Sequence, residues 1–392
     1  MTDHDASTPA LPALFPFAAI AGQPQLRQAL LLAAIDPQLG GVLIEGPRGT
    51  AKSTAARALA ELIDAAPFVT LPLGASLEHL AGTLDLEHAM AGNAVRFAPG
   101  LLARAHGGVL YVDEINLLPD ALVDVLLDAA ASGVNVVERD GISHRHAARF
   151  VLVGTMNPEE GQLRPQLLDR LGLCVQLANV SQPAERQAIV RARLAFDADP
   201  EAFRARHAAA QSDLAERLRQ ARARLQQPDA LPWPDDVHEA ASALCVAAQV
   251  DGLRADIVML RAARALAAWE AAPALLPRHV QDVAELVLVH RRKPGTAPAP
   301  QTPSASASEG ASKPDPAHAR DARDALDAQE GTDDGSDRRS NGGPAGDAGQ
   351  KGVAPPSEAD WGAMPPEPVA LQRPQSAHAA VPRNGAPTAK KA

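Results

Sequence analysis

Residues 41–62 read GVLIEGPRGTAKSTAARALAEL. The first five residues form a short apolar run, a glycine-rich segment follows, and the remainder has the pattern of a helix. A strand, a glycine-rich loop that ends in Lys-Ser, and a helix are the context that a phosphate-binding loop requires. We therefore predict that this stretch binds the phosphates of a nucleotide.

The chemistry of such a loop depends on its backbone and on two side chains. Successive N–H groups surround the β-phosphate, and the following helix adds its positive N-terminal end. We expect Lys52 to neutralise the β- and γ-phosphates and the Ser53 hydroxyl to ligate Mg²⁺. The residues expected to contact the nucleotide are Gly46, Gly49, Thr50, Ala51, Lys52, Ser53 and Thr54. Ala51 stands where a glycine usually precedes the lysine, and its methyl group is tolerable there if φ is negative.

A pair of acidic residues ends a second apolar run. Residues 108–112 read GVLYV, and Asp113 and Glu114 follow directly. Two adjacent carboxylates at a strand end are costly unless a cation shares the site. We expect Asp113 to hold Mg²⁺ through its water shell, and Glu114 to orient and deprotonate the attacking water.

Three further polar residues are candidates for contact with the γ-phosphate. Asn157 follows another apolar run and either hydrogen-bonds the phosphate or the water, or is an ordinary turn residue before a proline. Arg170 ends a short predicted helix and either reaches the nucleotide of a neighbouring subunit or pairs with Asp169. Arg254 opens a helix in the second half of the chain, from which it could touch the γ-phosphate.

The apolar pattern divides the chain into three parts. Residues 15–180 alternate short apolar runs with helical patterns, which indicates an α/β fold with a parallel sheet. The expected strands cover residues 41–45, 68–73, 109–112, 150–155 and 174–177. Residues 181–293 show helical spacing only, so we expect a helical lid domain. Residues 294–392 are rich in Pro, Ala, Gly, Ser and charge, so we expect a disordered tail, in which residues 360–364, DWGAM, are either a docking motif or chance.

Composition narrows the class of protein. The net charge of −10 gives non-specific nucleic-acid binding no electrostatic help. No window approaches the roughly 20 apolar residues of a membrane span. Residues 1–10 carry acids and no apolar stretch, so we expect no signal peptide there. Cys174 and Cys245 lack a CxxC or a nearby His pair, so we expect two buried thiols. A cytoplasmic protein without nucleic-acid partners is expected.

Together these motifs resemble those of AAA+ P-loop ATPases. The sequence of the segments in and around them resembles the I and D subunits of the magnesium and cobalt chelatases. The matching segments are 113–118 (DEINLL), 132–139 (SGVNVVER), 154–161 (GTMNPEEG) and 163–170 (LRPQLLDR). Residues 81–97 resemble the helix-2 insertion of the helix-2-insert clade, with a turn at Gly92-Asn93. Residues 137–149 resemble the family's hairpin before the sensor strand, with a turn at Gly141. Residues 17–23 resemble the segment that flanks the adenine. The resemblance covers about residues 15–293.

The resemblance assigns a role to each candidate residue. Lys52 and Ser53 would bind phosphate and Mg²⁺, Asp113 and Glu114 the metal and the water, Asn157 would be sensor 1, Arg170 the arginine finger and Arg254 sensor 2. Leu171 departs from the family, which usually has phenylalanine there, and we expect this difference to be conservative packing.

The resemblance also implies partners. A ring of copies, expected to be a hexamer, would bind ATP between neighbouring subunits, and Arg170 would arrive in trans. The chelatase would insert Mg²⁺ or Co²⁺ into a tetrapyrrole held by a separate large subunit. The D subunit continues into a von Willebrand A domain with a DxSxS motif that this sequence lacks, so we expect a separate von Willebrand A-type partner. ATP and Mg²⁺ are the expected cofactors.

Three other interpretations stay open at this point. A MoxR-type AAA+ chaperone would share the clade and would also work with a von Willebrand A partner. A nucleotide-binding scaffold that does not hydrolyse ATP is favoured only by Ala51. A DNA-translocating ring is the least favoured, because the expected hairpins carry no cluster of Lys or Arg beyond Arg139, Arg145 and Arg149. The metal, the tetrapyrrole and the ring size are not fixed by the sequence.

Overall fold

The computed structural model describes residues 13–293, apart from residues 65, 86–95, 140–141 and 228, together with residue 295. All of these belong to the first of two units into which the chain divides, residues 1–311. The tail expected from the sequence, with its DWGAM segment, lies outside the described residues except for residue 295.

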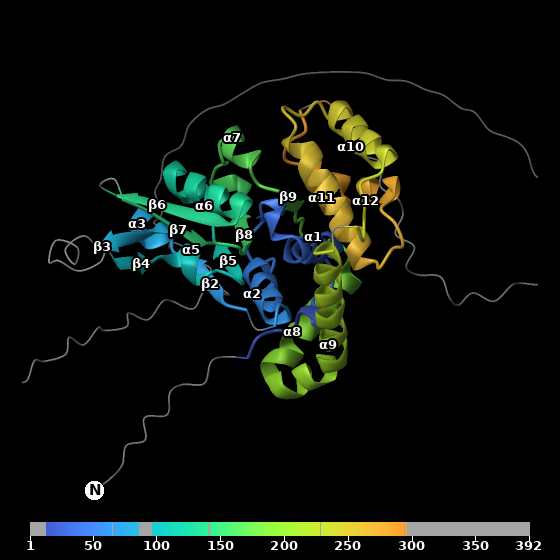
Figure 1. Ribbon diagram of the computed structural model, residues 1–392. Coiled ribbons are helices and arrows are strands. Elements are labelled where there is room, and N and C mark those ends of the chain that lie inside the picture. Colours follow the sequence, from blue (N-terminus) through green and yellow to red (C-terminus); the bar gives the residue numbers. More distant parts are fainter. Residues whose placement is uncertain are drawn as a thin grey trace, which may run out of the picture. The chain divides into compact units, whose positions relative to one another are not determined.

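The centre of the fold is a five-stranded parallel sheet with the strand order β2-β5-β8-β1-β9 (Figure 1). Its strands are β1 (Val42–Glu45), β2 (Phe68–Leu71), β5 (Val109–Val112), β8 (Val151–Met156) and β9 (Leu173–Gln176). Each lies within two residues of an expected strand, so the predicted parallel sheet is confirmed. Because all five strands run in one direction, their carboxyl ends meet at one edge of the sheet and their amino ends at the other.

Helices cover both faces of this sheet, because successive strand residues point to opposite faces. Val42 and Ile44 of β1 lie in a core that includes α1 (Pro24–Ile35) and α2 (Lys52–Leu62). Leu43, between them, lies in a second core that includes α6 (Asp120–Ser132). The smaller helices α3 (Leu77–Ala81) and α5 (Leu101–Arg104) contribute to the second core as well.

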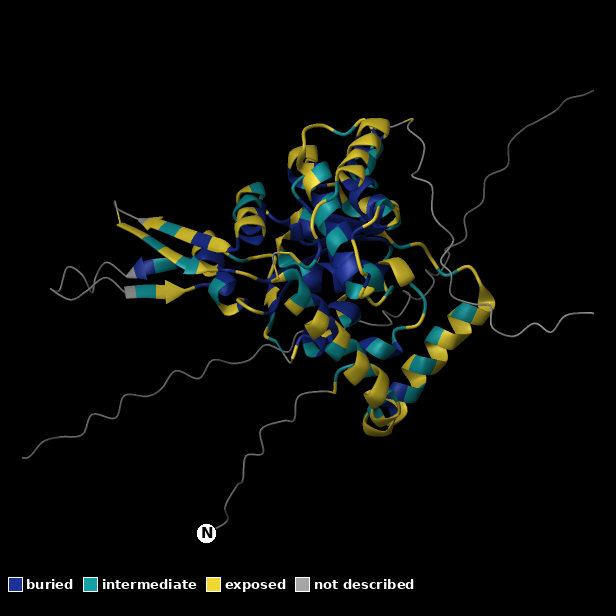
Figure 2. Ribbon diagram, turned by 45° about the vertical axis from the view of Figure 1, so that its right-hand side comes forward, coloured by how far each residue is buried: buried dark blue, intermediate teal, exposed yellow. Residues whose placement is uncertain are grey.

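Two antiparallel hairpins lie where hairpins were expected. The first pairs β3 (Gly82–Asp85) with β4 (Arg96–Pro99), and the second pairs β6 (Val134–Arg139) with β7 (Ile142–Ala147). Both predicted turns lie outside the described residues. In Figure 2 β7 is exposed or half-buried, whereas β1, β5 and β8 of the central sheet are buried. Leu84 of β3 is buried as well.

The second part of the chain is helical, as predicted. Its helices are α8 (Pro183–Ala198), α9 (Pro200–Leu225), α10 (Asp235–Ala247), α11 (Arg254–Trp269) and α12 (Pro277–Leu288). Apolar residues of α11 and α12 share the core that contains α1, so the helical part packs on the sheet domain. The remaining short helices are η1 (Phe17–Ala19), η2 (Pro37–Leu39), η3 (Ile115–Leu117), η4 (Pro158–Glu160) and α7 (Pro165–Leu168).

Two expectations from composition can be compared with the structure. Cys174 and Cys245 are both free and buried, as expected. Among the helices of the described part of the chain, none combines the length and the apolar character that crossing a membrane requires.

Candidate nucleotide-binding site

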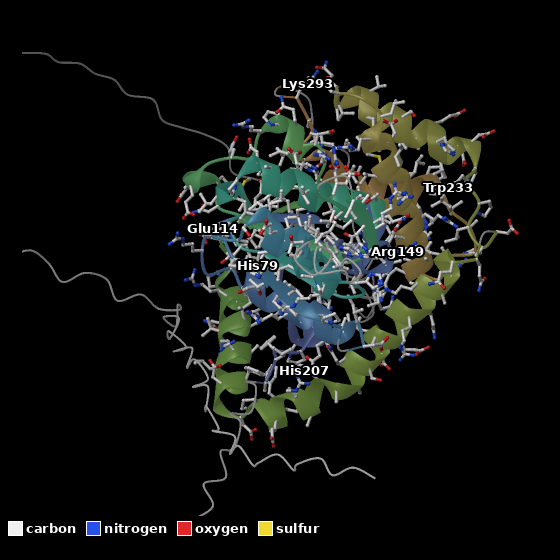
Figure 3. All side chains as sticks on the ribbon, turned by 60° about the vertical axis from the view of Figure 1, so that its left-hand side comes forward. His79, Glu114, Arg149, His207, Trp233 and Lys293 are labelled. Carbon is white, nitrogen blue, oxygen red and sulfur yellow. The ribbon has the colours of Figure 1, made fainter. Side chains whose placement is uncertain are left out.

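The sheet topology gathers the predicted hydrolytic residues. The loop of residues 46–51 follows β1, Asp113 and Glu114 follow β5, and Asn157 follows β8. These three strands are neighbours in the order β5-β8-β1. All these residues therefore meet at the carboxyl edge of the sheet, where ligands of open α/β sheets bind. Figure 3 labels Glu114 among the side chains of this region.

The phosphate loop is held in shape by its own lysine and by tight packing. Lys52 Nζ donates to the carbonyl oxygens of Gly46 at 2.6 Å and Pro47 at 3.5 Å. Gly46 has φ 149°, and a Cβ there would lie 2.7 Å from the carbonyl oxygen of Leu177, so no other residue fits. Burial lowers the pKa of Lys52, while the nearby Asp113 and Glu114 oppose that shift. The loop thus presents a cation opposite the two acids.

Ala51 does not meet the condition under which its methyl group would be tolerated without strain. Its φ is 59° and its ψ is 27°, in the left-handed region. It is the N-cap of α2, a position that usually has extended φ and ψ. An L-residue with a Cβ adopts this conformation at a cost of roughly 1–2 kcal/mol. The glycine that is usual here would avoid that strain.

Asp113 is fixed by two hydroxyl groups. Its Oδ1 accepts hydrogen bonds from Tyr111 Oη at 2.9 Å and from Thr155 Oγ1 at 2.7 Å. Burial raises the pKa of Tyr111 above its usual range, so its hydroxyl stays protonated and can donate. Thr155 Oγ1 also accepts from the backbone N–H of Glu114 at 3.1 Å, so one threonine links both acids. Sequence analysis missed Thr155, although a polar residue inside the run VLVGTM was a usable signal.

Glu114 lies in a cluster of opposite and like charges. Arg48 Nη2 lies 3.4 Å from Glu114 Oε1 and 2.6 Å from Glu160 Oε1. Burial raises the pKa of Glu114, and the negative charge of Glu160 raises it further, while Arg48 opposes both effects. A carboxylate with a raised pKa is a better proton acceptor, as a general base requires. Neither Arg48 nor Glu160 was singled out from the sequence.

Asn157 has the bonds of a turn residue and also lies beside the acidic cluster. Its Oδ1 accepts from the backbone N–H of Glu159 at 3.3 Å and so caps η4, as a turn residue would. Its Nδ2 donates to Glu160 Oε1 at 3.2 Å, which places it beside the cluster around Glu114. The side chain is buried and oriented by these two bonds.

The structure does not bring Arg170 to the phosphate loop of its own chain. Arg170 lies just before β9, and Leu173 at the start of β9 pairs with Val42 at the start of β1. The loop follows the other end of β1, about 13 Å away at about 3.3 Å per residue. The guanidinium of Arg170 makes ion pairs with Asp124 and Asp128 of α6, and not with Asp169 as the alternative had it.

Arg254 lies with the Arg170 turn at the amino edge of the sheet. Its Nη1 is 3.8 Å from Asp169 Oδ2, and Asp169 also accepts from Arg291 Nε at 3.1 Å. Leu171, the departure from the family pattern, is fully buried, as conservative packing requires. The candidate residues therefore form two groups at opposite edges: the loop, the two acids and Asn157 at one, the two arginines at the other.

The donor set at the carboxyl edge suits Mg²⁺. A serine hydroxyl and a carboxylate are hard oxygen ligands, and Mg²⁺ is usually held by one or two such groups together with substrate phosphates and water. Ser53 and Asp113 both lie near the hydroxyl of Tyr111, so the two side chains are close to one another. Among the described residues there is no group of three or more His, Cys, Asp or Glu that could hold a metal ion.

Comparisons with known proteins agree with this architecture. The family model of the AAA domain (dynein-related subfamily) matches residues 41–171, and that of the AAA lid domain matches residues 238–314. A chain from the magnesium-chelatase structure of the complex between subunits BchI and BchD is 46% identical; the match covers 72% of this chain and 97% of that one, with a TM-score of 0.43.

Two curated relatives differ in length. The uncharacterized protein Rv2850c of Mycobacterium tuberculosis is 53% identical over 285 residues, which are 71% of this chain and 45% of that protein. This chain therefore spans less than half of that relative. The magnesium-chelatase 38 kDa subunit of Cereibacter sphaeroides is 47% identical over 71% of this chain and 92% of its own length. With an AAA domain, an AAA lid and this similarity over nearly the whole of a relative, the chain belongs to the family of the magnesium-chelatase 38 kDa subunits, which are AAA ATPases.

Proposed function

We propose that this chain is the ATP-hydrolysing motor subunit of a metal chelatase, which inserts Mg²⁺ or Co²⁺ into a tetrapyrrole held by a separate large subunit. The observation that carries the proposal is the joining of two neighbouring strand ends by Thr155 of β8, which bonds to Asp113 and to the backbone of Glu114 after β5. The phosphate loop follows β1, the other neighbour of β8. The similarity to magnesium-chelatase subunits supports a chelatase as the complex in which this ATPase acts.

In the proposed mechanism each residue has one task. The loop N–H groups and Lys52 hold the β- and γ-phosphates of ATP, and Ser53 and Asp113 would hold Mg²⁺, which supplies positive charge against the phosphates. Glu114 takes the proton of the attacking water while Asn157 orients the water or the γ-phosphate. The raised pKa of Glu114 favours this proton transfer.

The second group of residues would act on another copy. Arg170 and Arg254 lie at the edge opposite to the loop of their own chain. In a ring of copies, that edge would face the nucleotide of the neighbouring subunit, where Arg170 would neutralise charge that develops on the γ-phosphate. We propose a ring, expected to be a hexamer, in the cytoplasm, with a von Willebrand A-type subunit and the large tetrapyrrole-binding subunit as partners.

One substitution tests the hydrolytic assignment. Glu114→Gln should bind ATP but lower steady-state turnover by about 10²–10⁴-fold, because an amide does not accept the proton of the water. Glu159→Gln is the matched control, because Glu159 lies on the adjacent exposed turn and only its backbone N–H bonds to Asn157. Turnover of the Glu114→Gln protein within a few-fold of the unsubstituted chain would refute the role of Glu114.

One observation favours a second candidate function. The left-handed Ala51 strains the loop, which would suit a scaffold that binds nucleotide without turnover. Measurable ATP hydrolysis by the purified chain, abolished by Glu114→Gln, would exclude the scaffold. Co-purification with a large tetrapyrrole-binding subunit would support the chelatase.

A further inference from the structure

The turn that carries Arg170 is held by the far end of the helical lid. This turn, residues 169–172, joins α7 to β9. Two residues that bond to it, His290 and Arg291, follow α12; they lie 119 residues after Leu171 and 122 residues after Asp169. Residues 238–314 match the AAA lid, so these two belong to the lid and not to the sheet domain. Lys293, two residues beyond Arg291, is labelled in Figure 3.

Arg291 uses all three guanidinium nitrogens on this turn. Nε donates to Asp169 Oδ1 at 3.1 Å, Nη1 donates to the carbonyl oxygen of Gly172 at 3.0 Å, and Nη2 donates to the carbonyl oxygen of Asp169 at 2.8 Å and to that of Leu171. Nη1 also donates to the carbonyl oxygen of Val287 in its own helix at 2.6 Å. The side chain is 2% exposed. The bonds enclose Arg170 on both sides, so they fix its Cα and the direction in which its side chain leaves the backbone.

His290 adds a second bond to the same turn. Its Nε2 lies 3.2 Å from the carbonyl oxygen of Leu171, which can only accept, so Nε2 carries the proton. Burial lowers the pKa of His290 to about 3, so the ring is neutral at physiological pH. Two adjacent lid residues therefore hold one carbonyl group next to Arg170.

The direct contacts of Arg170 come from the sheet domain. Asp124 and Asp128 of α6 pair with its guanidinium, and its N–H donates to the carbonyl oxygen of Leu167 at 3.1 Å. The lid bonds to the residues on either side of it. A rigid-body movement of the lid would consequently shift the backbone of Arg170 relative to these carboxylates. A guanidinium is suited to this task because its planar fork can bind several carbonyl oxygens at once, which the single ammonium of lysine cannot.

We infer that Arg291 is a positioning residue through which the lid of one subunit places Arg170 at the nucleotide of the neighbouring subunit. The inference rests on the proposed trans role of Arg170 and deepens it, because it assigns control of the finger to the lid of the chain that carries the finger. Loss of Arg291 should leave the subunit's own phosphate loop and base intact. It should remove only the contribution of Arg170 to hydrolysis at the neighbouring subunit's nucleotide.

Mixing subunits tests this directly. Arg291→Lys should bind ATP with unchanged affinity in calorimetry, keep its assembly on a sizing column and lower turnover by about 10²-fold, the effect expected of a displacement near 1 Å. Mixed with Glu114→Gln subunits, which keep the finger but lack the base, the Arg291→Lys subunits should regain part of the turnover. Mixed with Arg170→Ala subunits, they should regain none, because both partners then lack a working finger.

The neighbouring arginine provides a matched control. Arg292 pairs with Glu285 of its own helix, with Nη1 and Nη2 3.0 and 2.7 Å from the two carboxylate oxygens. Arg292→Lys should keep turnover within a few-fold of the unsubstituted chain, although it is the same substitution one residue further along.

The outcomes separate this inference from the proposed function. Full turnover by Arg291→Lys would overturn the role of Arg291. So would a loss of turnover in Arg291→Lys that Glu114→Gln subunits do not rescue, if the same subunits do rescue Arg170→Ala. Both outcomes would leave the assignment of Arg170 as the finger standing. Absence of rescue for Arg170→Ala itself, although the two proteins co-assemble, would overturn the trans finger on which both depend.

A milder pair of variants covers the case in which Arg291→Lys does not fold. His290→Leu removes the second donor to the carbonyl oxygen of Leu171, whereas His290→Gln keeps an N–H at the position of Nε2. We expect a several-fold loss of turnover for the leucine variant, rescued by Glu114→Gln subunits, and near-normal turnover for the glutamine variant. Equal turnover in the two variants would contradict the inference.

Discussion

The two edges of the central sheet hold their polar residues in different ways. At the carboxyl edge, the acids and the lysine are held by short bonds within the sheet domain, such as those of Thr155 and of the loop carbonyls. At the amino edge, the turn of Arg170 is held by the lid. In the proposed ring each chain would contribute two half-sites, one held by bonds within its sheet domain and one bonded to its lid as well.

The largest expected effect comes from the amino edge. Arg170→Ala should lower ATP turnover by about 10³–10⁵-fold, the contribution of arginine fingers elsewhere, while ATP affinity measured by calorimetry stays unchanged. Arg164→Ala is the control. Arg164 makes an exposed ion pair at 2.7 Å with Asp120, the first residue of α6, and α6 also carries the two aspartates that pair with Arg170. If Arg170→Ala weakened ATP binding in isolated subunits, Arg170 would belong to the site of its own chain and the contrast between the edges would fail.

A smaller effect is expected at the carboxyl edge, in the pH dependence of turnover. The base must be deprotonated, so turnover should fall as pH falls through the pKa of Glu114, which burial and Glu160 raise above its ordinary 4.5. Glu160→Gln removes the like charge and should move this acidic limb to lower pH. Arg48→Met removes the opposing cation and should move it to higher pH.

The pH profiles need an independent check of folding. Circular dichroism over the same pH range would show that each variant remains folded where its turnover is measured. A limb that stays in place in both variants would mean that Glu114 is not the group that titrates.

The smallest effect concerns backbone strain in the phosphate loop. Ala51→Gly relieves a left-handed conformation that costs roughly 1–2 kcal/mol, but it also adds about 0.4–1 kcal/mol of entropy to the unfolded chain. We expect a gain below about 1 kcal/mol in the free energy of unfolding by urea. Ala209→Gly, in the exposed interior of α9, should instead lose about 1 kcal/mol. Similar losses in both variants would argue against strain at Ala51.

Sequence patterns predicted the carboxyl edge more completely than the amino edge. A strand followed by a glycine-rich loop, and a strand followed by two acids, are local signals, and the parallel sheet brings them together. The bonds of Arg291 to the turn of Arg170 join residues 119 to 122 positions apart, and no local pattern marks them. The same limit explains why Asp124 and Asp128 were not foreseen as partners of Arg170.

Other differences have their own physical reasons. The left-handed φ of Ala51 at the start of α2 is a property of the backbone that the residue type alone does not reveal. The sequence left Asn157 open between a cap and a site residue; the structure shows the cap bond to Glu159 and a second bond to Glu160, and the role at the phosphate stays a prediction. The chaperone interpretation is disfavoured by the similarity to the 38 kDa subunits over nearly their full length.

The burial of both cysteines makes the natural chain suitable for site-specific labelling. Cys174 lies in β9 and Cys245 in α10, and burial raises the pKa of both thiols, that of Cys245 to about 12. The thiolate is the form that attacks an alkylating dye, so both native thiols should react slowly at neutral pH. A single cysteine added to the surface of the lid and another on α6 could thus carry a fluorescent donor and acceptor without removal of the native pair. Energy transfer between the dyes would then follow the lid through each turnover in otherwise unaltered subunits.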